Sequence, residues 1–375
     1  ASAANTDRDS YYGPGNDPLK AYGKTTDLTA MGGVQYVHTF DKCLFMPSDL
    51  TAGLEYNRDR LKDNMWGYDR HTDQTVNIYS AFLQNEWKNE RWSILVGGRL
   101  DKHNMVDNII FSPRANLRFN PTQNINLRLS YSSGFRAPQA FDEDMHIENV
   151  GGTVAMIERA KDLKEEKSQS FSASADMYHR FGAFQTNLLI EGFYTRLTDV
   201  FVLGEPYDRG DGILVKTRSN GPGAKVMGLT LEGKVAYLSI LQIQAGLTLQ
   251  RSRYDEPHKW HDDVPAKRTI FRTPNVYGYF TATYIPIKPL SIALSGTYTG
   301  SMFVQRMDIT AENAAMGDMP ERKAEAVKTP KFLDLGVKLA YDFKLYKTVD
   351  LQLSGGVQNI LEAYQKDFDR GANRD

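Results

Sequence analysis

A two-residue alternation of apolar and polar side chains recurs along most of this sequence and constrains its fold more than any other feature. From Asn124 to Ser132 one side carries Ile, Leu, Leu and Tyr, and the other carries Asn, Asn, Arg, Ser and Ser. Similar runs occur at 50–57, 241–250, 290–299, 333–342 and 349–358. Successive side chains of a β-strand point to opposite faces, so each run predicts a strand with one apolar face.

The lengths of these strands and of their connections favour a membrane barrel over a soluble β-sandwich. About fourteen strands are expected, many of them longer than the usual five or six residues. The connections alternate between short turns and long polar segments. The short turns are expected within 40–48, 88–91, 120–123, 180–183, 236–239, 286–289 and 342–347, and the long segments at 57–75, 101–109, 134–167, 196–222, 252–270 and 300–330. Outer-membrane barrels combine short periplasmic turns with long extracellular loops.

The bulk properties are compatible with this fold and exclude several others. No run approaches the 18 or so apolar residues of a transmembrane helix, whereas barrel strands alternate and average out as polar. A net charge of -1 gives no indication of nucleic acid as a partner. The single cysteine, Cys43, excludes an intramolecular disulfide and a thiolate metal cluster.

Five stretches, which follow one another in a fixed order along the chain, indicate a more specific kind of barrel. They are SYSSGFRAPQAF (130–141), DLKEEKSQSFSASADMY (162–178), EGFYTRLTDVFVL (191–203), NGPGAKVMGLTLEGKV (220–235) and SGGVQNILEAYQKDF (354–368). The first resembles the Gly-Phe-Arg-Ala-Pro signature of TonB-dependent outer-membrane receptors, and the others resemble later segments of that family. Glu165 and Thr230 depart from the family pattern, which usually has Pro and Glu there.

The resemblance implies an all-β transmembrane antiparallel barrel, with residues 1–375 as a large fragment of the family's 22 strands. It covers nearly the whole chain, weakly at residues 1–25. The family's N-terminal plug and its last strand are not recognised, and the chain is expected to start in an extracellular loop. Gly134 is expected where strand pairing ends and Pro138 where the strand cannot continue. Phe135 would then lie at the membrane interface, with Arg136 directed to the lumen or to Asp142, Glu143 and Asp144.

The resemblance also implies function, partners and place. The parent protein would be a receptor in the outer membrane of a Gram-negative bacterium. It would take up a scarce, bulky ligand such as a ferric siderophore or cobalamin, with haem as a further candidate. Uptake would be energised by the TonB–ExbB–ExbD complex through the plug. Outer-membrane lipid and lipopolysaccharide are expected partners, and a surface lipoprotein is a further candidate; no resident cofactor is expected.

Candidate ligand-binding residues lie in the long polar segments. Imidazole and indole groups can stack on or ligate a planar or metal-bearing cargo, which makes segment 252–270 the most suggestive. The candidates are Arg136, Asp142, His146, Tyr207, Tyr254, His258, Trp260 and His261. A solvated loop without a binding role explains the same residues, and three adjacent acids at 142–144 cannot all face one cation in extended backbone.

Two other functions are compatible with a barrel. A passive porin would show the same alternation, and the five ordered stretches are what favour the receptor. A barrel hydrolase would need a paired Ser and His facing lipid, and His38 and His179 lie near short turns without an adjacent catalytic serine. An enzyme is therefore not expected.

Overall fold

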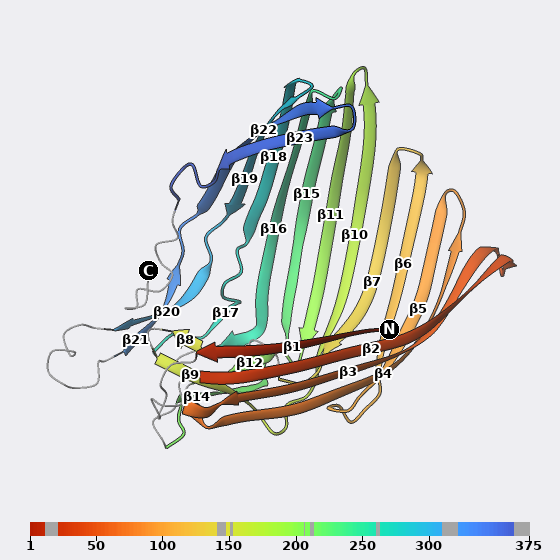
Figure 1. Cartoon of the computed structure of the whole chain (residues 1–375). Coiled ribbons are helices and arrows are strands. Elements are labelled where there is room, and N and C mark those ends of the chain that lie inside the picture. Colours follow the sequence, from red (N-terminus) through yellow and green to blue (C-terminus); the bar gives the residue numbers. More distant parts are fainter. Residues whose placement is uncertain are drawn as a thin grey trace.

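The computed structural model describes residues 1–11, 22–140, 148–150, 153–205, 207–210, 214–259, 263–309 and 322–363. Within these residues sixteen strands form one sheet, in which fifteen follow the order of the chain with antiparallel pairing and β17 adds to β16. Figure 1 shows the sheet as a curved, open wall. The fifteen strands are β1 (Ser2–Tyr11), β2 (Tyr22–Cys43), β3 (Met46–Met65), β4 (Arg70–Lys88), β5 (Trp92–His103), β6 (Ile110–Thr122), β7 (Ile125–Arg136), β10 (Glu166–Phe181), β11 (Phe184–Thr198), β15 (Ala224–Tyr237), β16 (Leu241–His258), β18 (Val276–Ile287), β19 (Leu290–Thr299), β22 (Phe332–Tyr346) and β23 (Val349–Val357).

The long connections carry short strands of their own, which gather at one end of the sheet (Figure 1). We call this the long-loop end and the opposite end the short-turn end. β8, β9, β12, β13 and β14 form a second, five-stranded sheet, and β20 pairs with β21. The added elements are β8 (Glu148–Val150), β9 (Thr153–Arg159), β12 (Phe201–Leu203), β13 (Tyr207–Asp208), β14 (Leu214–Asn220), β17 (Lys267–Thr269), β20 (Phe303–Ile309), β21 (Arg322–Lys328) and the 3-10 turn η2 (Trp66–Tyr68). None of the helical segments in the described residues is long and apolar enough to cross a membrane.

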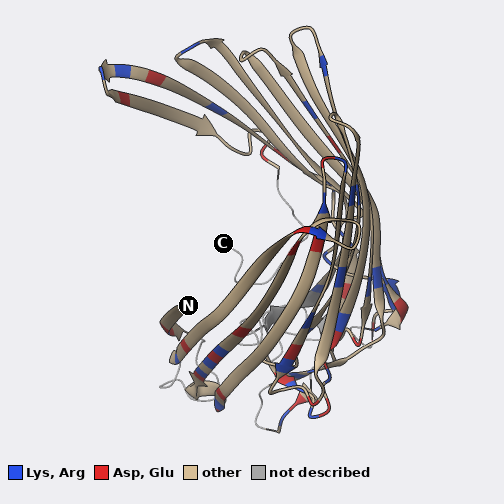
Figure 2. Cartoon of the chain, turned by 90° about the vertical axis from the view of Figure 1, so that its right-hand side faces the viewer, with Lys and Arg blue, Asp and Glu red and all other residues tan. Residues whose placement is uncertain are grey.

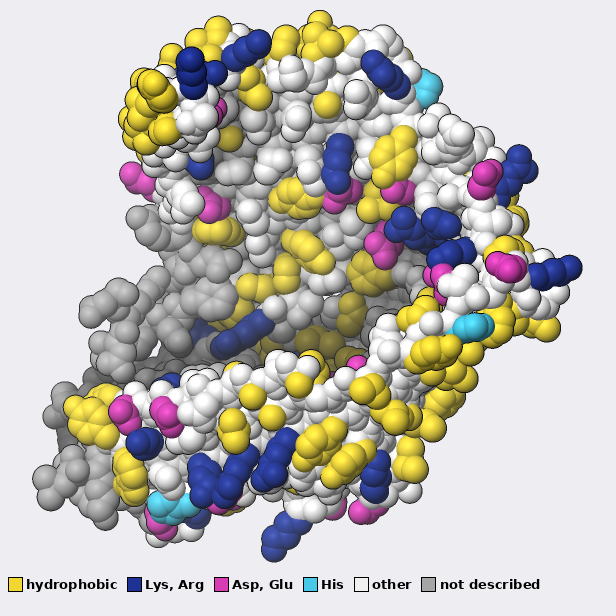
Figure 3. All heavy atoms as spheres, turned by 45° about the vertical axis from the view of Figure 1, so that its right-hand side comes forward, with side chains coloured by type: hydrophobic (Ala, Val, Ile, Leu, Met, Phe, Trp, Pro, Cys, Tyr) yellow, Lys and Arg dark blue, Asp and Glu magenta, His cyan; other side chains and the backbone are white. Residues whose placement is uncertain are grey.

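The two faces of the sheet follow the alternation that the sequence shows. On β16, Ile243, Leu247 and Leu249 are 40–44% exposed on one face, and Thr248, on the other, is only 8% exposed. Hydrophobic side chains are exposed over much of the sheet (Figure 3). Many of the charged residues lie toward the long-loop end, which is the lower end in Figure 2. An exposed apolar face of this extent is expected for a sheet solvated by lipid.

Two aromatic rows bound the apolar face. One row crosses neighbouring strands through Tyr131, Phe171 and Tyr194, and the other through Phe181, Phe184 and Tyr237. In the first row the ring centroids of Tyr131 and Phe171 lie 4.8 Å apart. In the second row the centroid of Phe184 lies 5.6 Å from that of Phe181 and 4.8 Å from that of Tyr237. These rows occupy the positions of the interfacial girdles of membrane barrels.

The distance between the rows matches a bilayer. On β10 the rows are ten residues apart, from Phe171 to Phe181, and on β11 they are again ten apart, from Tyr194 to Phe184. Ten residues at about 3.3 Å each give roughly 33 Å along a strand, or about 25 Å along the membrane normal at a tilt of about 40°. That is the height of the apolar band of an outer-membrane barrel.

The opposite face is polar and internally bonded. Arg99 donates hydrogen bonds to Glu55, Asp101 and Ser80 at 2.6, 2.8 and 2.8 Å, and so joins β3, β4 and β5. Further along the sheet, Tyr279 donates to Glu232 at 2.7 Å. The face opposite the apolar one is therefore polar at these residues, as the alternation predicts.

Two predicted segment boundaries are wrong. Residues 57–75, expected as a loop, continue as β3 and β4 to a tight turn at η2. The backbone ladder persists there although the apolar alternation has ended, because beyond the bilayer both faces of a hairpin can be polar. Residues 2–11, expected in an extracellular loop, form β1 and pair with residues 22–31 of β2 for the same reason.

The junction at residues 134–138 also differs in detail. Gly134 pairs with Ser168 and the ladder continues to Arg136, which pairs with Glu166. Strand β7 ends there, before Pro138. Phe135 packs against a buried cluster of Val106, Ile110 and Ala137. The strand therefore ends two residues later than the glycine suggests, because the antiparallel partner β10 extends as far.

The face assignment on β16 can be tested by lysine substitution in the full natural protein. Leu247→Lys places a charge near the middle of the apolar band and is expected to lower the free energy of unfolding by about 2–4 kcal/mol. Gln244→Lys is the control, because Gln244 lies on the polar face within 3.2 Å of Glu232 and a lysine there meets a carboxylate. Denaturant titration in lipid measures both variants, and equal losses would contradict the assignment.

Candidate functional site

Three excursions of the chain pack together at the long-loop end. Met65 and Tyr68 from the β3–β4 hairpin form a buried cluster with Met156 of β9 and Val215 of β14. Met156 and Val215 are at most 1% exposed. β9 and β14 also pair in parallel from Ala155 to Arg159. This small core fixes segments from three different hairpins against one another.

A polar cavity of about 590 Å³ lies beside this core. Its walls come from the β3–β4 turn, the β5–β6 connection, the chain after β7, β9 with the turn that follows it, and the chain after β13. The lining residues are Asp69, Arg70, His71, Thr72, Met105, Pro138, Ala140, Ile157, Glu158, Arg159, Ala160, Lys161, Leu163 and Arg209. Among the lining residues that the structure describes, four are Arg or Lys and two are Asp or Glu, so this part of the lining has a surplus of positive charge.

Gln74 connects two walls of this cavity. Its Oε1 accepts hydrogen bonds from the Ala140 amide at 2.8 Å and from Arg159 Nη1 at 2.9 Å. Arg159 Nη1 also donates to the Pro138 carbonyl at 2.9 Å. The chain that leaves the β7 junction is thereby tied to β4 and β9, and the Arg159 side chain is held at the cavity.

Two further arginines have defined partners. Arg70 forms an ion pair with Asp63 at 2.7 Å, and Asp63, which is fully buried, also accepts from Thr25 at 2.6 Å. Arg209 donates to the Tyr68 carbonyl at 3.2 Å, and its other terminal nitrogen lies 3.9 Å from Glu158. These contacts pre-organise guanidinium groups, which bind planar anionic oxygens in a bidentate manner.

His103 positions another part of the wall. Its Nδ1 accepts from the Met105 amide at 3.0 Å, so its Nε2 donates to Gln139 Oε1 at 3.1 Å. Burial lowers the pKa of His103, against the opposing effects of the Gln139 hydrogen bond and the Asp101 charge. The imidazole is therefore neutral at pH 7 and able to accept the Met105 hydrogen bond.

The four sequence-predicted site residues that the structure describes do not line this cavity. Arg136 lies over the Phe201 ring, with 5.4 Å between its Cζ and the ring centroid, and the predicted contact with 142–144 falls outside the described residues. Tyr207 is exposed on β13. Tyr254 and His258 contact each other on β16 with ring centroids 5.4 Å apart. Burial lowers the pKa of His258, while burial and then the charge of Glu166 raise the pKa of Tyr254.

Four of the predicted site residues, Asp142, His146, Trp260 and His261, lie outside the described residues. Sequence reasoning missed Arg70, Arg159, Lys161 and Arg209 as a group. They belong to three of the long polar segments, and the signal that could have found them is the presence of basic residues in connections assigned to the same end of the sheet.

The neutral state of His103 predicts a pH dependence. Because the folded-state pKa is lowered, the unfolded segment binds a proton that the folded one excludes. The resulting stability is present above about pH 6.5 and is lost as the pH falls below it. We expect protection of the Met105 amide from hydrogen exchange, corrected for the intrinsic rate, to fall by up to about tenfold between pH 6.5 and 5.5.

The control for this pH dependence is His103→Asn, which cannot titrate in this range. Its Met105 amide should show no corresponding change with pH. An unchanged protection in the unsubstituted protein would contradict a titrating imidazole at the cavity wall.

The comparisons with known proteins agree with the geometry. The family described as TonB dependent receptor-like, beta-barrel matches residues 1–360, which includes the first 25 residues. No curated protein matches the chain in sequence.

Several solved structures share the fold. The ferric enterobactin receptor of Pseudomonas aeruginosa superimposes with a TM-score of 0.67 at 18% identity, covering 96% of this chain and 53% of the receptor. The siderophore receptor PirA of Acinetobacter baumannii gives 0.64 at 14% identity, with 96% and 55% covered. The FrpB iron transporter of Neisseria meningitidis gives 0.63 at 14% identity, with 94% and 54% covered.

The chain thus spans about half the length of these receptors. The family match extends over nearly all of the chain. The open antiparallel sheet of this chain is consistent with part of the barrel of these receptors. The chain belongs to the TonB-dependent receptor β-barrel family.

Proposed function

We propose that the protein is an outer-membrane receptor that takes up an anionic ferric chelate of the siderophore class. The observation that carries this proposal is the cavity at the long-loop end, where four basic side chains converge from three connections. A surplus of guanidinium and ammonium groups favours a ligand with several anionic oxygens. The structurally similar proteins include a ferric enterobactin receptor, a siderophore receptor and an iron transporter, which supports the same ligand class.

The charge of the cavity also separates the rival ligands. Cobalamin and long neutral glycans offer few anionic oxygens to such a lining. Haem would need an axial ligand, and His258, with its lowered pKa, is a neutral imidazole. Its ring packs against Tyr254, however, and it does not line the cavity. His71 does line the cavity, but both of its ring nitrogens have partners, Nδ1 at 2.9 Å from Asn64 Oδ1 and Nε2 at 3.6 Å from Asp69. The anionic chelate therefore fits the described site best.

Energy coupling belongs to the same proposal. Family membership implies an interaction with TonB, and ExbB and ExbD would supply the proton-motive force through it. The long-loop end would face the outside of the cell and the short-turn end the periplasm, so ligand would meet the basic cavity first. A passive porin would instead take up ligand without energy.

Ligand binding is tested by equilibrium titration of the full natural protein with a ferric catecholate and, in parallel, a neutral ferric complex. Lys161→Gln is the most informative variant, since Lys161 is exposed and its loss removes charge without disturbing a buried contact. Combined with Arg209→Gln, it should weaken catecholate binding by about tenfold or more, because hydrogen bonds to charged groups contribute about 1.5–3 kcal/mol each.

Arg128→Gln is the matched control, because Arg128 lies on β7 outside the cavity lining and bonds Asn126 at 2.7 Å. It should bind the catecholate as the unsubstituted protein does. Unchanged binding in the double variant, or equal binding of the neutral complex, would refute the anionic-chelate proposal. A His258→Ala variant that loses haem-dependent growth would favour haem instead.

Active transport is tested separately, by uptake of the labelled chelate into cells with and without a protonophore. Accumulation should stop when the proton-motive force is removed, while surface binding continues. Uptake that persists without the force would support a passive porin.

A further inference from the structure

Three arginines lie on the polar face of β6 and β7, the two strands that run from the wall of the basic cavity to the short-turn end. Met105 precedes β6 and Pro138 follows β7, and both residues line that cavity. Because successive residues of a strand face opposite sides, the alternation of β6 and β7 puts Arg114, Arg118 and Arg128 on the polar face. We call these three residues the arginine strip.

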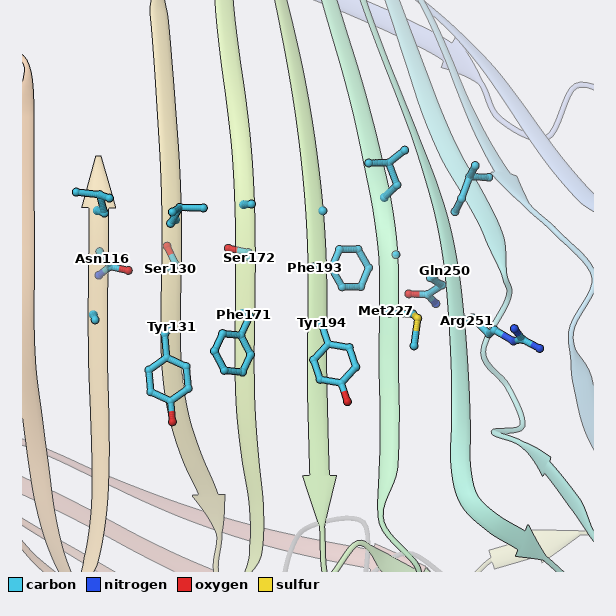
Figure 4. A pocket seen from close by; sticks show the side chains of 18 of the residues that line it. Asn116, Ser130, Tyr131, Phe171, Ser172, Phe193, Tyr194, Met227, Gln250 and Arg251 are labelled. Atoms are coloured by element: carbon cyan, nitrogen blue, oxygen red, sulfur yellow. The ribbon is translucent and has the colours of Figure 1, made fainter. Parts of the chain in front are cut away.

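Two members of the arginine strip stand directly opposite each other. Arg118 pairs with Arg128 in the β6–β7 ladder, and Arg114 lies four residues before Arg118, nearer the long-loop end. Asn116 and Ser130 occupy the positions between them and lie side by side in Figure 4. Like charges directly opposite each other on neighbouring strands destabilise a sheet. An anion between the two guanidinium groups would remove this repulsion.

The charge of the arginine strip is not compensated within the described part of the chain, where no residue forms an ion pair with it. Arg128 donates to the neutral amide of Asn126 at 2.7 Å, and the Nε of Arg118 has no hydrogen-bond partner among the described residues. On the same face of β4, Glu86 accepts from Ser93 at 2.6 Å. Since arginine stays protonated in proteins, the strip keeps its positive charge on the polar face.

We propose that the arginine strip is the path along which an anionic ferric chelate leaves the basic cavity for the periplasm. This inference rests on the function proposed above and adds residues that act after the ligand has bound. A wall lined by one sign of charge raises the local concentration of counter-ions. Guanidinium groups also offer paired donors to planar anionic oxygens. Because no described carboxylate pairs with the strip, these donors are available to the chelate.

The arginine strip predicts that uptake and binding can be separated. Both are measured with a labelled ferric catecholate on the full natural protein, uptake in energised cells and binding by equilibrium titration. Arg118→Gln combined with Arg128→Gln should lower the uptake rate by about tenfold, whereas the affinity, which the cavity sets, should not change. Arg118→Lys with Arg128→Lys keeps both charges and should restore uptake. The control is Arg251→Gln with Arg253→Gln, which removes the same charge from the apolar face of β16 and should leave uptake unchanged.

A second arm tests contact between the chelate and the arginine strip. A ferric catecholate that carries a thiol-reactive group is supplied to energised cells whose receptor has Cys43→Ser. Ser130→Cys, between members of the strip, should then form an adduct. Thr297→Cys, on the polar face of β19, is the control position and should not. The adduct at position 130 should be lost in the double glutamine variant of the strip.

The inference is overturned if the glutamine variant takes up the chelate at the unsubstituted rate, if it loses affinity together with uptake, or if the control loses as much uptake. Equal labelling at positions 130 and 297 overturns it as well. A lysine variant that fails to restore uptake would give the arginines a structural role and have the same consequence. The two proposals fail separately: a receptor that binds no catecholate disproves the ligand class and the strip with it, whereas normal binding with unchanged uptake disproves the strip alone.

Discussion

Backbone hydrogen bonding is the constraint on which the rest of this structure depends. A strand that crosses a hydrocarbon layer has no water to satisfy its amides and carbonyls, so each of these groups must pair with a neighbouring strand. The fifteen strands do this in chain order, with antiparallel registers that run without a shift over most of their length. Continuous registers then fix every side chain to one face.

This constraint explains how distant sequence positions become functional neighbours. Because partners are directly opposite, Tyr131, Phe171 and Tyr194 align into a row although no short sequence motif joins them. The same registers bring Arg196, Lys225 and Arg253 into a second row. Lipid-facing and lumen-facing surfaces are thus built on alternate residues of the same strands. A substitution of a lipid-facing residue changes the membrane contact, whereas a substitution of the next residue along the strand changes the interior wall.

The sequence predicted the fold because the alternation of apolar and polar residues can be recognised within each strand by itself. It located the short turns, the apolar faces and the long-loop end. It failed where a strand no longer has an apolar face: residues 57–75 and 2–11 remain in the sheet through backbone pairing alone. No hydropathy pattern marks such an extension.

The basic cavity could not be predicted because it depends on contacts between connections. Arg159 is held at the cavity by a hydrogen bond to Gln74, which is 85 residues earlier in the chain. Arg209 is held there by a hydrogen bond to the carbonyl of Tyr68, which is 141 residues away in the chain. Reasoning from single loops instead favoured aromatic and histidine residues within 252–270. Of these, Tyr254 and His258 pack on each other, outside the cavity lining.

The orientation of the sheet in the membrane is the central claim, because the ligand-binding proposal needs the long-loop end to face outward. Labelling with a membrane-impermeant maleimide on intact cells tests it most directly. Cys43 lies next to a short turn, with its carbonyl accepting from Trp87 Nε1 at 3.0 Å, and Lys161 is exposed at the long-loop end. The account predicts that Cys43 stays unlabelled and that a Cys43→Ser/Lys161→Cys variant is labelled. Labelling of Cys43 without labelling at position 161 would contradict it.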